Sequence, residues 1–171
     1  MKSIASPTEN IPNQDQLIDK MSKKDRIIYF LEDHEISIRS VKKIIPEIEH
    51  CIEEIVKKIN KSGLSKIIYI GAGTSGRIGM MDSLELYPTF SWPENRTFFL
   101  LAGGKKSLIS PVENAEDNID AAIKEIKMVN NINRDVVIAI SASGNTPFTV
   151  EALKEAKKRG ALTVGIANNK N

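Results

Sequence analysis

The sequence has little of several residue types, and each shortage excludes a class of protein. Cys51 is the single cysteine among 171 residues, so neither an internal disulfide nor a zinc site built from several thiolates can form. Aromatic residues make up only 5% of the chain, and its 24 basic and 22 acidic residues are interspersed, for a net charge of +2. The chain therefore lacks the basic stripe and the aromatic stacking surface of nucleic-acid binding proteins.

Long apolar runs and metal-ligand clusters are also missing. No run approaches the length needed to cross a membrane, and Met1 to Pro7 lack the apolar stretch of a signal peptide, so we expect a cytoplasmic protein without a membrane partner. His34 and His50 have no partner at metal-ligand spacing, so no metal site is expected. No cofactor is expected either. Cys51 falls in an apolar helical stripe, which predicts a buried structural thiol.

Residues 1–63 are predicted to form a polar arm followed by helices. The arm extends to about Asn13, and short apolar groups at 17–21 and 27–31 suggest short helices. Apolar residues then recur every three or four positions from Val41 to Ile59, which predicts a long amphipathic helix ending at Ser62-Gly63. Pro46 either kinks this helix or marks a boundary between two helices.

Residues 64–171 alternate between short apolar runs and helical sequence, which predicts an α/β domain. The runs at 66–70, 97–101, 135–140 and 162–167 are almost entirely apolar, as in parallel strands buried on both faces. The hydrophobic content of 41% is enough for one core. We expect a doubly wound parallel sheet flanked by helices, in the order second, first, third, fourth strand.

Two of the predicted strands end in small, hydroxyl-rich loops. One runs into Gly71-Ala-Gly-Thr-Ser-Gly-Arg77 and the other into Ser141-Ala-Ser-Gly-Asn-Thr146. In the predicted order these strands are neighbours at the topological switch point, where open α/β sheets bind ligands. Backbone N–H groups, hydroxyls and helix N-termini would converge there on an anion such as a phosphate. The groups expected to bind it are Gly73, Thr74, Ser75, Ser141, Ser143, Gly144 and Thr146.

The loops allow two other interpretations. Gly71, Gly73 and Gly76 spell GxGxxG, the dinucleotide-binding pattern, but that site needs an acidic residue at the end of the second strand. Here the second strand ends in Ala102-Gly-Gly104, so a nicotinamide cofactor is disfavoured. The other interpretation needs no ligand, because the glycines can make tight turns while Ser and Thr cap helices.

Several motifs together closely resemble the N-acetylmuramic acid 6-phosphate etherases, which have the sugar isomerase (SIS) fold. The resemblance extends from about Thr8 to the end of the chain. The motifs that carry it are Gly71-Ala-Gly-Thr-Ser-Gly-Arg-Ile-Gly79, Glu85 before Pro88-Thr89, Ala102-Gly-Gly104, Val112-Glu-Asn-Ala-Glu-Asp117 and Ser141-Ala-Ser-Gly-Asn-Thr-Pro147.

The resemblance implies a reaction and two catalytic residues. The family cleaves the D-lactyl ether of N-acetylmuramic acid 6-phosphate by elimination and hydration, which gives N-acetylglucosamine 6-phosphate and D-lactate in the recycling of cell-wall amino sugars. Glu85 matches the family's proton donor and Glu116 its second active-site glutamate. Arg77 is a possible substrate contact, although helix arginines are often solvated.

Each glutamate also has an explanation without catalysis. Glu85 lies near the end of a predicted helix, where a solvated carboxylate is common. Ser110 and Glu113 form an S-x-x-E capping box with Pro111 between them, which predicts a helix start there. Glu116, one turn further, would then favour the helix dipole.

The chain departs from the family pattern in sequence and in length. Asn145 stands where the family has an arginine, which removes a positive charge beside the phosphate loop, and Leu86-Tyr87 replace Cys-Pro. The family continues beyond the fourth strand, so the fold is expected to lack its last strand and the chain to be an N-terminal portion. We therefore expect a homo-oligomer, such as a homodimer, or pairing with a complementary C-terminal fragment. An active lyase, a phosphosugar-binding module and an inactive fragment all remain open.

Overall fold

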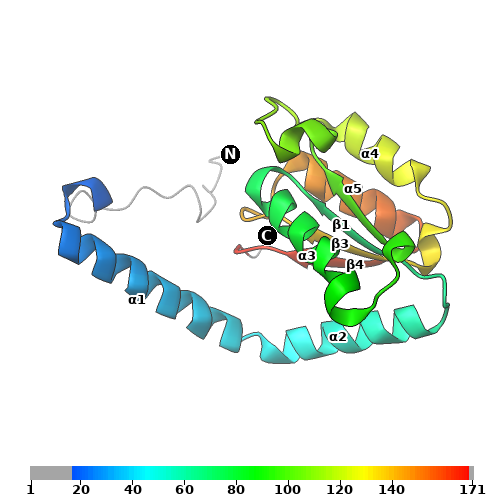
Figure 1. The fold of residues 1–171 in the computed structure, drawn as a ribbon, viewed down its shortest axis with the longest axis horizontal. Coiled ribbons are helices and arrows are strands. Elements are labelled where there is room, and N and C mark those ends of the chain that lie inside the picture. Colours follow the sequence, from blue (N-terminus) through cyan, green and yellow to red (C-terminus); the bar gives the residue numbers. More distant parts are fainter. Residues whose placement is uncertain (1–16, 170–171) are drawn as a thin grey trace, which may run out of the picture. The chain divides into compact units, whose positions relative to one another are not determined.

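The computed structural model describes residues 17–169, so the predicted arm up to Asn13 lies outside the described residues. The chain divides into two compact units, Met1–Glu53 and Glu54–Asn171, and each is described by itself (Figure 1).

The first unit is helical in its described part. It contains the 3-10 turn η3 (Ile18–Lys20), the helix α1 (Lys23–Lys42) and the start of α2 (Ile45–Asn60). Ser22 caps α1, because its hydroxyl accepts the backbone N–H of Asp25 at 3.1 Å. The prediction of a separate short helix at 27–31 was wrong, since those residues belong to the 20-residue α1.

The position of Pro46 settles the question of the long predicted helix. Pro46 lies in the first turn of α2, where its missing N–H would have had no partner within the helix, so it marks a boundary and not a kink. The helix predicted from Val41 therefore begins only at Ile45. Cys51, within α2, is partly exposed, so the expectation of a buried thiol was wrong.

The second unit is built on a parallel sheet of four strands in the order β2-β1-β3-β4. The strands are β1 (Ile67–Gly71), β2 (Thr97–Leu101), β3 (Val136–Ile140) and β4 (Leu162–Ile166). Gly71, at the end of β1, is the register partner of both Leu101 and Ile140. The predicted strands, their order and the doubly wound topology are confirmed.

Helices cover both faces of this sheet. Figure 1 shows α3 (Gly73–Phe90) on one face, where it contacts β1 and β2. On the other face, α5 (Pro147–Lys158) lies over β1, β3 and β4 and is packed against α4 (Ile119–Met128). Three short 3-10 turns complete the unit: η4 (Glu94–Arg96), η5 (Gly104–Leu108) and η6 (Ile132–Arg134).

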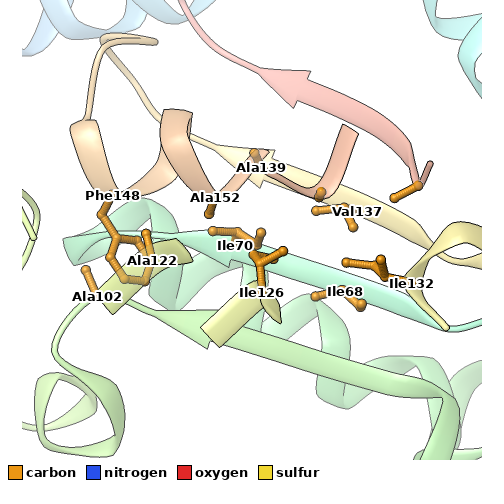
Figure 2. Close-up of a cluster of buried hydrophobic side chains, with 12 residues drawn as sticks. Ile68, Ile70, Ala102, Ala122, Ile126, Ile132, Val137, Ala139, Phe148 and Ala152 are labelled. Atoms are coloured by element: carbon orange, nitrogen blue, oxygen red, sulfur yellow. The ribbon is translucent and has the colours of Figure 1, made fainter. Parts of the chain in front are cut away.

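The main core lies between the sheet and the helices α4 and α5 (Figure 2). Phe148, 1% exposed, is the largest fully buried side chain in the described part of the chain. The small residues Ala122, Ala152 and Ala156 let the two helices approach each other and the strands. The remaining members of the cluster are Ile68, Ile70, Ala102, Ile126, Ile132, Val137, Ala139 and Ala161.

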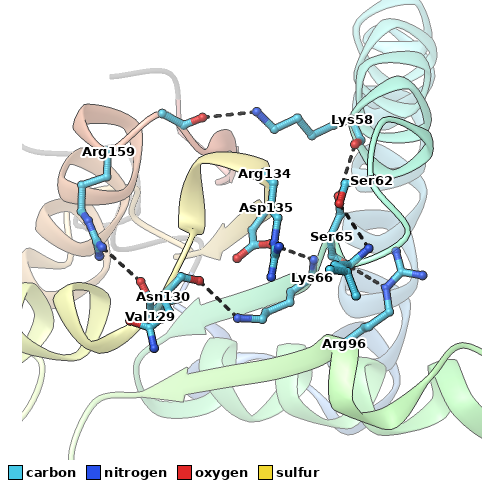
Figure 3. A network of polar contacts seen from close by, with 12 residues as sticks. Lys58, Ser62, Ser65, Lys66, Arg96, Val129, Asn130, Arg134, Asp135 and Arg159 are labelled. Carbon is cyan, nitrogen blue, oxygen red and sulfur yellow. Dashed lines mark hydrogen bonds and ion pairs between the residues drawn. The ribbon is translucent and has the colours of Figure 1, made fainter.

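The amino ends of the strands are joined by polar side chains (Figure 3). The backbone N–H of Lys66, before β1, donates to Oδ1 of Asp135, before β3, at 2.9 Å. Nε of Arg96, before β2, donates to the backbone carbonyl of Ser65 at 2.6 Å. Nζ of Lys58 donates to the carbonyl of Gly160 at 3.2 Å, just before β4. Polar side chains, of which Asp135 is fully buried, thus bond the main chain where the strands begin.

Candidate functional site

The turn from β1 into α3 is built on glycines that let two backbone segments touch. A Cβ on Gly71 would lie 2.6 Å from the Cα of Gly76, and a Cβ on Gly76 would lie 2.3 Å from Cδ1 of Leu101. Side chains at these two positions would therefore push α3 away from the end of β1. The packing of helix on strand explains both glycines without a ligand.

The first residues of α3 leave the start of the helix open. Gly73 has φ +53°, and a Cβ there would meet nothing within 4 Å, so this glycine is required by its backbone conformation. Thr74 is exposed, and no side chain caps the helix at Ala72. The N–H groups of the first turn are consequently available to an anion.

The turn from β3 into α5 is held by hydroxyl groups. The hydroxyls of Ser141 and Thr146 are 2.9 Å apart, and the N–H of Gly144 donates to Oγ of Ser141 at 3.1 Å. The N–H of Asn145 donates to Oγ of Ser143, also at 3.1 Å. These bonds give the loop a defined shape before any ligand binds, as a preorganised anion site requires.

The two turns start side by side, because Gly71 and Ile140 are register partners in neighbouring strands. The seven groups predicted to bind phosphate thus lie at one end of the sheet, at its topological switch point. The dinucleotide alternative gains no support, since β2 ends in Leu101 and continues into Ala102 and two glycines. Among residues 17–169, no group of three acidic, His or Cys side chains could hold a metal ion.

Arg77 lies in the second turn of α3, close to this site. Its guanidinium donates to the carbonyl of Ser107 at 3.1 Å and to Oγ1 of Thr74 at 3.1 Å. Both acceptors are neutral, so the positive charge of Arg77 has no carboxylate partner within the described residues. The charge remains free to act on an anion beside Thr74.

Glu116 lies next to the second turn, but not on a helix. The predicted capping box at Ser110 and Glu113 was wrong, because α4 begins only at Ile119 and is capped by Asn118. Asn114 has φ +57°, a left-handed conformation that a helix cannot contain. The carbonyl of Glu116 accepts the N–H of Phe148 at 2.8 Å, which places this glutamate against the first turn of α5.

Glu85 lies far from the two turns within its own chain. It is an exposed residue of α3, eleven positions after Thr74, and this spacing corresponds to about 16 Å along the helix axis. The structure therefore brings Glu116 to the carboxyl end of the sheet and leaves Glu85 on the side of the unit.

A buried tyrosine joins α3 to β1 beneath this region. The hydroxyl of Tyr69, whose ring is 7% exposed, donates to Oδ2 of Asp82 at 2.5 Å. Burial, reinforced by this bond and by the negative charge of Asp82, raises the pKa of Tyr69 well above its usual range. Tyr69 thus remains a protonated donor that holds α3 on the sheet.

Sequence reasoning missed three residues that support the site. Asn168 donates its N–H to the carbonyl of Ala142 at 3.0 Å, and Nδ2 of Asn169 donates to the carbonyl of Ser143 at 3.2 Å. Both lie within three residues of the end of β4, so the rule that loops meet at the carboxyl edge could have found them. Ser107, which accepts from Arg77, carried no signal in the sequence.

Comparisons with known proteins agree with this geometry. Residues 47–157 match the family described as glucokinase regulatory protein N-terminal SIS domain. The chain belongs to the SIS-domain family. Its fold is similar to that of a phosphoheptose isomerase from Francisella tularensis, with a TM-score of 0.67 and 21% identity over 86% of this chain and 76% of that one.

Curated relatives of this SIS chain carry the name N-acetylmuramic acid 6-phosphate etherase. The protein of that name from Mycoplasma mycoides is 39% identical over 165 residues, which are 96% of this chain and 54% of the relative. The one from Deinococcus radiodurans is 40% identical over 146 residues, 85% of this chain and 47% of the relative. The chain spans about half the length of the curated relatives it matches, in agreement with the predicted resemblance to a portion of an etherase.

Within residues 17–169, every helix is too short or too polar to span a membrane.

Proposed function

We propose that this chain binds a phosphorylated amino sugar at the carboxyl ends of β1 and β3 and carries the lyase chemistry of the etherases. The substrate would be N-acetylmuramic acid 6-phosphate, and the products N-acetylglucosamine 6-phosphate and D-lactate. The observation that carries this proposal is the 39% identity to an etherase over 96% of the chain. The two turns at the switch point of the sheet support it independently.

The phosphate would lie between the two turns. In this proposal the uncapped first turn of α3, at Gly73, Thr74 and Ser75, supplies backbone N–H groups and hydroxyls. The Ser141 to Thr146 turn closes the other side, and Arg77 adds a positive charge next to Thr74. This arrangement favours a compact phosphate monoester over a dinucleotide.

The chemistry would be an elimination followed by addition of water. A base removes the proton from carbon 2 of the ring-opened sugar, and this electron pair forms a double bond to carbon 3 as the ether C–O bond breaks. An acid protonates the departing lactate oxygen, and water then adds at carbon 3 while carbon 2 regains a proton. We assign these proton transfers to Glu85, as donor, and to Glu116.

A binding module without catalysis is the second candidate. The distance of about 16 Å along α3 between Glu85 and Thr74 favours it, because one copy of the chain does not bring both glutamates to the phosphate site. Asn145, in place of an arginine, also lowers the positive charge of the second turn.

We further propose a cytoplasmic location and a second polypeptide as partner. A charged sugar phosphate does not cross a bilayer unaided, so an enzyme that uses it must share its compartment. Within the described residues, β4 is paired with β3 on one side only. The partner would be a second copy or a chain that corresponds to the remaining half of the etherases.

Calorimetry and lactate assays test the proposal together. N-acetylglucosamine 6-phosphate should bind, and N-acetylglucosamine without phosphate should not. Glu85→Gln should lower D-lactate release by about a hundredfold while binding is preserved, since it removes a proton transfer and keeps the shape. Glu113→Gln, a change at an exposed glutamate near Glu116, is the matched control and should leave the rate unchanged.

The outcomes separate the candidates. Phosphate-dependent binding without any lactate release would favour the binding module. Equal binding of the phosphorylated and unphosphorylated sugars would contradict the phosphate site itself.

A further inference from the structure

A basic hollow of about 450 Å³ lies at the amino end of the sheet, opposite to the two phosphate turns. The loops that precede β1 and β2 form part of its wall, where Leu64 is 63% exposed. Three cationic residues also line it, Lys66, Arg96 and Arg134. Among its lining residues, all within 17–169, none is acidic. The hollow is therefore positively charged.

The register of the sheet brings these three cations together. The first residues of β1, β2 and β3 are register partners. Lys66 and Arg96 directly precede β1 and β2, and Arg134 lies two residues before β3. Neighbouring strands are about 4.8 Å apart, so the main chains that carry the two arginines are about 10 Å apart, on either side of β1. Figure 3 shows both arginines flanking Ser65 and Lys66. Positive charges at this spacing repel one another, and an anion between them would remove the repulsion.

Both arginines carry a nitrogen atom that lacks an acceptor. Within the described residues, Nη2 of Arg96 and Nε of Arg134 are buried and have no hydrogen-bond partner. Nε of Arg134 is 4.0 Å from Oδ1 of Asp135, which is beyond hydrogen-bond distance. Native proteins pair nearly all such groups, because a buried donor without an acceptor costs free energy. Two unpaired donors beside one hollow point to an acceptor from outside the chain.

The existing contacts hold these side chains in place without neutralising the three charges. Nε of Arg96 donates to the carbonyl of Ser65 at 2.6 Å, and its guanidinium stacks on the ring of Trp92 at 4.0 Å. Nζ of Lys66 donates to the carbonyl of Asn130 at 3.4 Å. The carboxylate of Asp135 offsets one charge, but it is fully buried and does not line the hollow. A guanidinium fixed in this way presents its remaining N–H groups in a defined direction, as phosphate binding requires.

We propose that the basic hollow binds the phosphate group of a small molecule between Arg96 and Arg134, with Lys66 as a third positive charge. The side chains that bond the main chain fill the strand ends themselves, so the anion would lie beside them, toward Leu64. A phosphate dianion has enough acceptor oxygens for two guanidinium groups at once. Bound there, it would join the starts of three strands and stabilise the sheet. This site is separate from the phosphosugar site and does not depend on the proposed function.

The first test uses Trp92 as a reporter. It is the only tryptophan of the chain and stacks on Arg96, so its fluorescence responds to changes at the basic hollow. Inorganic phosphate titrated into the full chain should change this fluorescence to a plateau, and sodium chloride at equal ionic strength should not. A saturating change with neither inorganic phosphate nor N-acetylglucosamine 6-phosphate would overturn the proposal.

The two phosphate compounds distinguish the sources of the ligand. Tighter binding of N-acetylglucosamine 6-phosphate would support the site and show that the hollow also holds the organic part of a phosphate ester. Equal or weaker binding of the ester would support the site for free phosphate.

Arg134→Met tests the position of the anion. It removes a guanidinium that makes no hydrogen bond within the described residues, so the fold should be preserved. The dissociation constant for phosphate should rise by about tenfold or more, the loss expected for hydrogen bonds to a charged group. Arg39→Met is the matched control, because Arg39 is an exposed arginine of α1 in a surface ion pair with Glu35 at 3.6 Å. Equal weakening in both variants would show only non-specific attraction of anions and would overturn the proposal.

Urea denaturation gives a second measurement that does not rely on fluorescence changes upon binding. Phosphate at ten times its dissociation constant should raise the folding equilibrium constant of the wild type by about elevenfold, and that of Arg134→Met much less. Phosphate also stabilises proteins by exclusion from their surface, so the difference between the two chains is the relevant quantity. An equal rise in both would contradict the site.

A last variant separates this site from the phosphosugar site. Thr146→Val alters the turn at the carboxyl end of the sheet and should leave the phosphate response of Trp92 unchanged. If Thr146→Val abolishes that response and Arg134→Met does not, the anion binds at the carboxyl end and the basic hollow is refuted. If the chain releases no lactate, the proposed lyase activity fails, while the Arg134→Met result still decides this site.

Discussion

The two ends of the sheet hold their loops by different chemistry. At the amino end, charged side chains such as Asp135 and Arg96 bond the main chain directly, and Asp135 is fully buried. At the carboxyl end, the bonds come from small hydroxyls such as Ser141 and Thr146, and α3 starts without a cap. The amino end thus uses side chains to bond its own main chain, although Oδ2 of Asp135 and Nη2 of Arg96 are buried there without a hydrogen-bond partner. The carboxyl end leaves the first turn of α3 without a side-chain cap.

This difference suggests a division of tasks between stability and binding. Long side chains that reach the main chain of a neighbouring segment fix the strands, but they also fill the space that a ligand would need. Short hydroxyls fix only their own loop and leave the surface open. Substitutions at the two ends should therefore have separable effects on unfolding and on phosphosugar binding.

The largest expected effect is a loss of stability caused by a substitution at the carboxyl end. It would therefore run against the division of tasks between the two ends. Gly76→Ala would place a Cβ 2.7 Å from the carbonyl carbon and 2.8 Å from the oxygen of Gly71, so the backbone has to move. We expect a loss of about 3 kcal/mol in the free energy of unfolding, measured by urea denaturation. Gly63→Ala, where a Cβ meets nothing within 4 Å, is the control and should change stability by less than about 0.5 kcal/mol. Equal stability of the two variants would show that α3 can shift freely.

The next largest loss of stability is expected from a substitution at the amino end of the sheet. Asp135→Ala removes the acceptor for the N–H of Lys66 and should lower the free energy of unfolding by about 2 kcal/mol while phosphosugar binding is unchanged. Asp135→Asn keeps an oxygen at this position and should cost less. Weaker binding by a folded Asp135→Ala protein would contradict the separation of the two ends.

The stability of the wild type and that of Asp135→Asn should depend on pH in different ways. Burial raises the pKa of Asp135 above its ordinary value, although the N–H of Lys66 and nearby cations partly oppose this. A raised pKa in the folded state means that wild-type stability falls as the pH rises from about 4 towards that pKa. The side chain introduced by Asp135→Asn cannot ionise, so the free energy of unfolding of this variant should lack this fall with rising pH. An identical pH dependence in both proteins would exclude Asp135 as its source.

The smallest effect on stability is expected from a hydroxyl at the carboxyl end, and it tests directly whether binding and stability can be separated. Thr146→Val keeps the shape of the side chain but removes the hydroxyl that bonds Ser141, and it should cost less than about 1 kcal/mol in unfolding. Phosphosugar binding, measured by calorimetry, should weaken by about tenfold, because the turn would lose a hydroxyl of the proposed phosphate site and a bond that shapes the turn. Thr163→Val on β4 is the matched control and should alter neither quantity. If both threonine variants bind alike, the hydroxyl of Thr146 does not contact the phosphate.

The sequence predicted the sheet well because its signals are local. Apolar runs bounded by turn residues mark each strand, and the right-handed crossover rule leaves few possible orders, so β2-β1-β3-β4 and the neighbouring turns of β1 and β3 followed. The helix start at Ser110 failed because a capping box is also local, whereas the left-handed backbone at Asn114 is set by the surrounding loop.

Distances across the site could not be predicted in the same way. A motif shows that Glu85 and Glu116 occur in the chain, but not that α3 carries Glu85 several turns away from Thr74. The network of Asn168 and Asn169 with the second turn was equally hidden, because it joins segments that are more than 20 residues apart.

These hydrogen bonds tie the second turn to the end of β4, the edge strand next to β3. The N–H of Ser141 donates to the carbonyl of Ile166 at 3.0 Å, and Asn168 donates back to Ala142. Each local opening of β4 breaks these bonds and leaves the second turn with only the hydrogen bonds that it makes within itself. The fraying of β4 should therefore loosen the second turn. A segment that pairs with the edge of β4 left unpaired within residues 17–169 would therefore steady the second turn without contact to it.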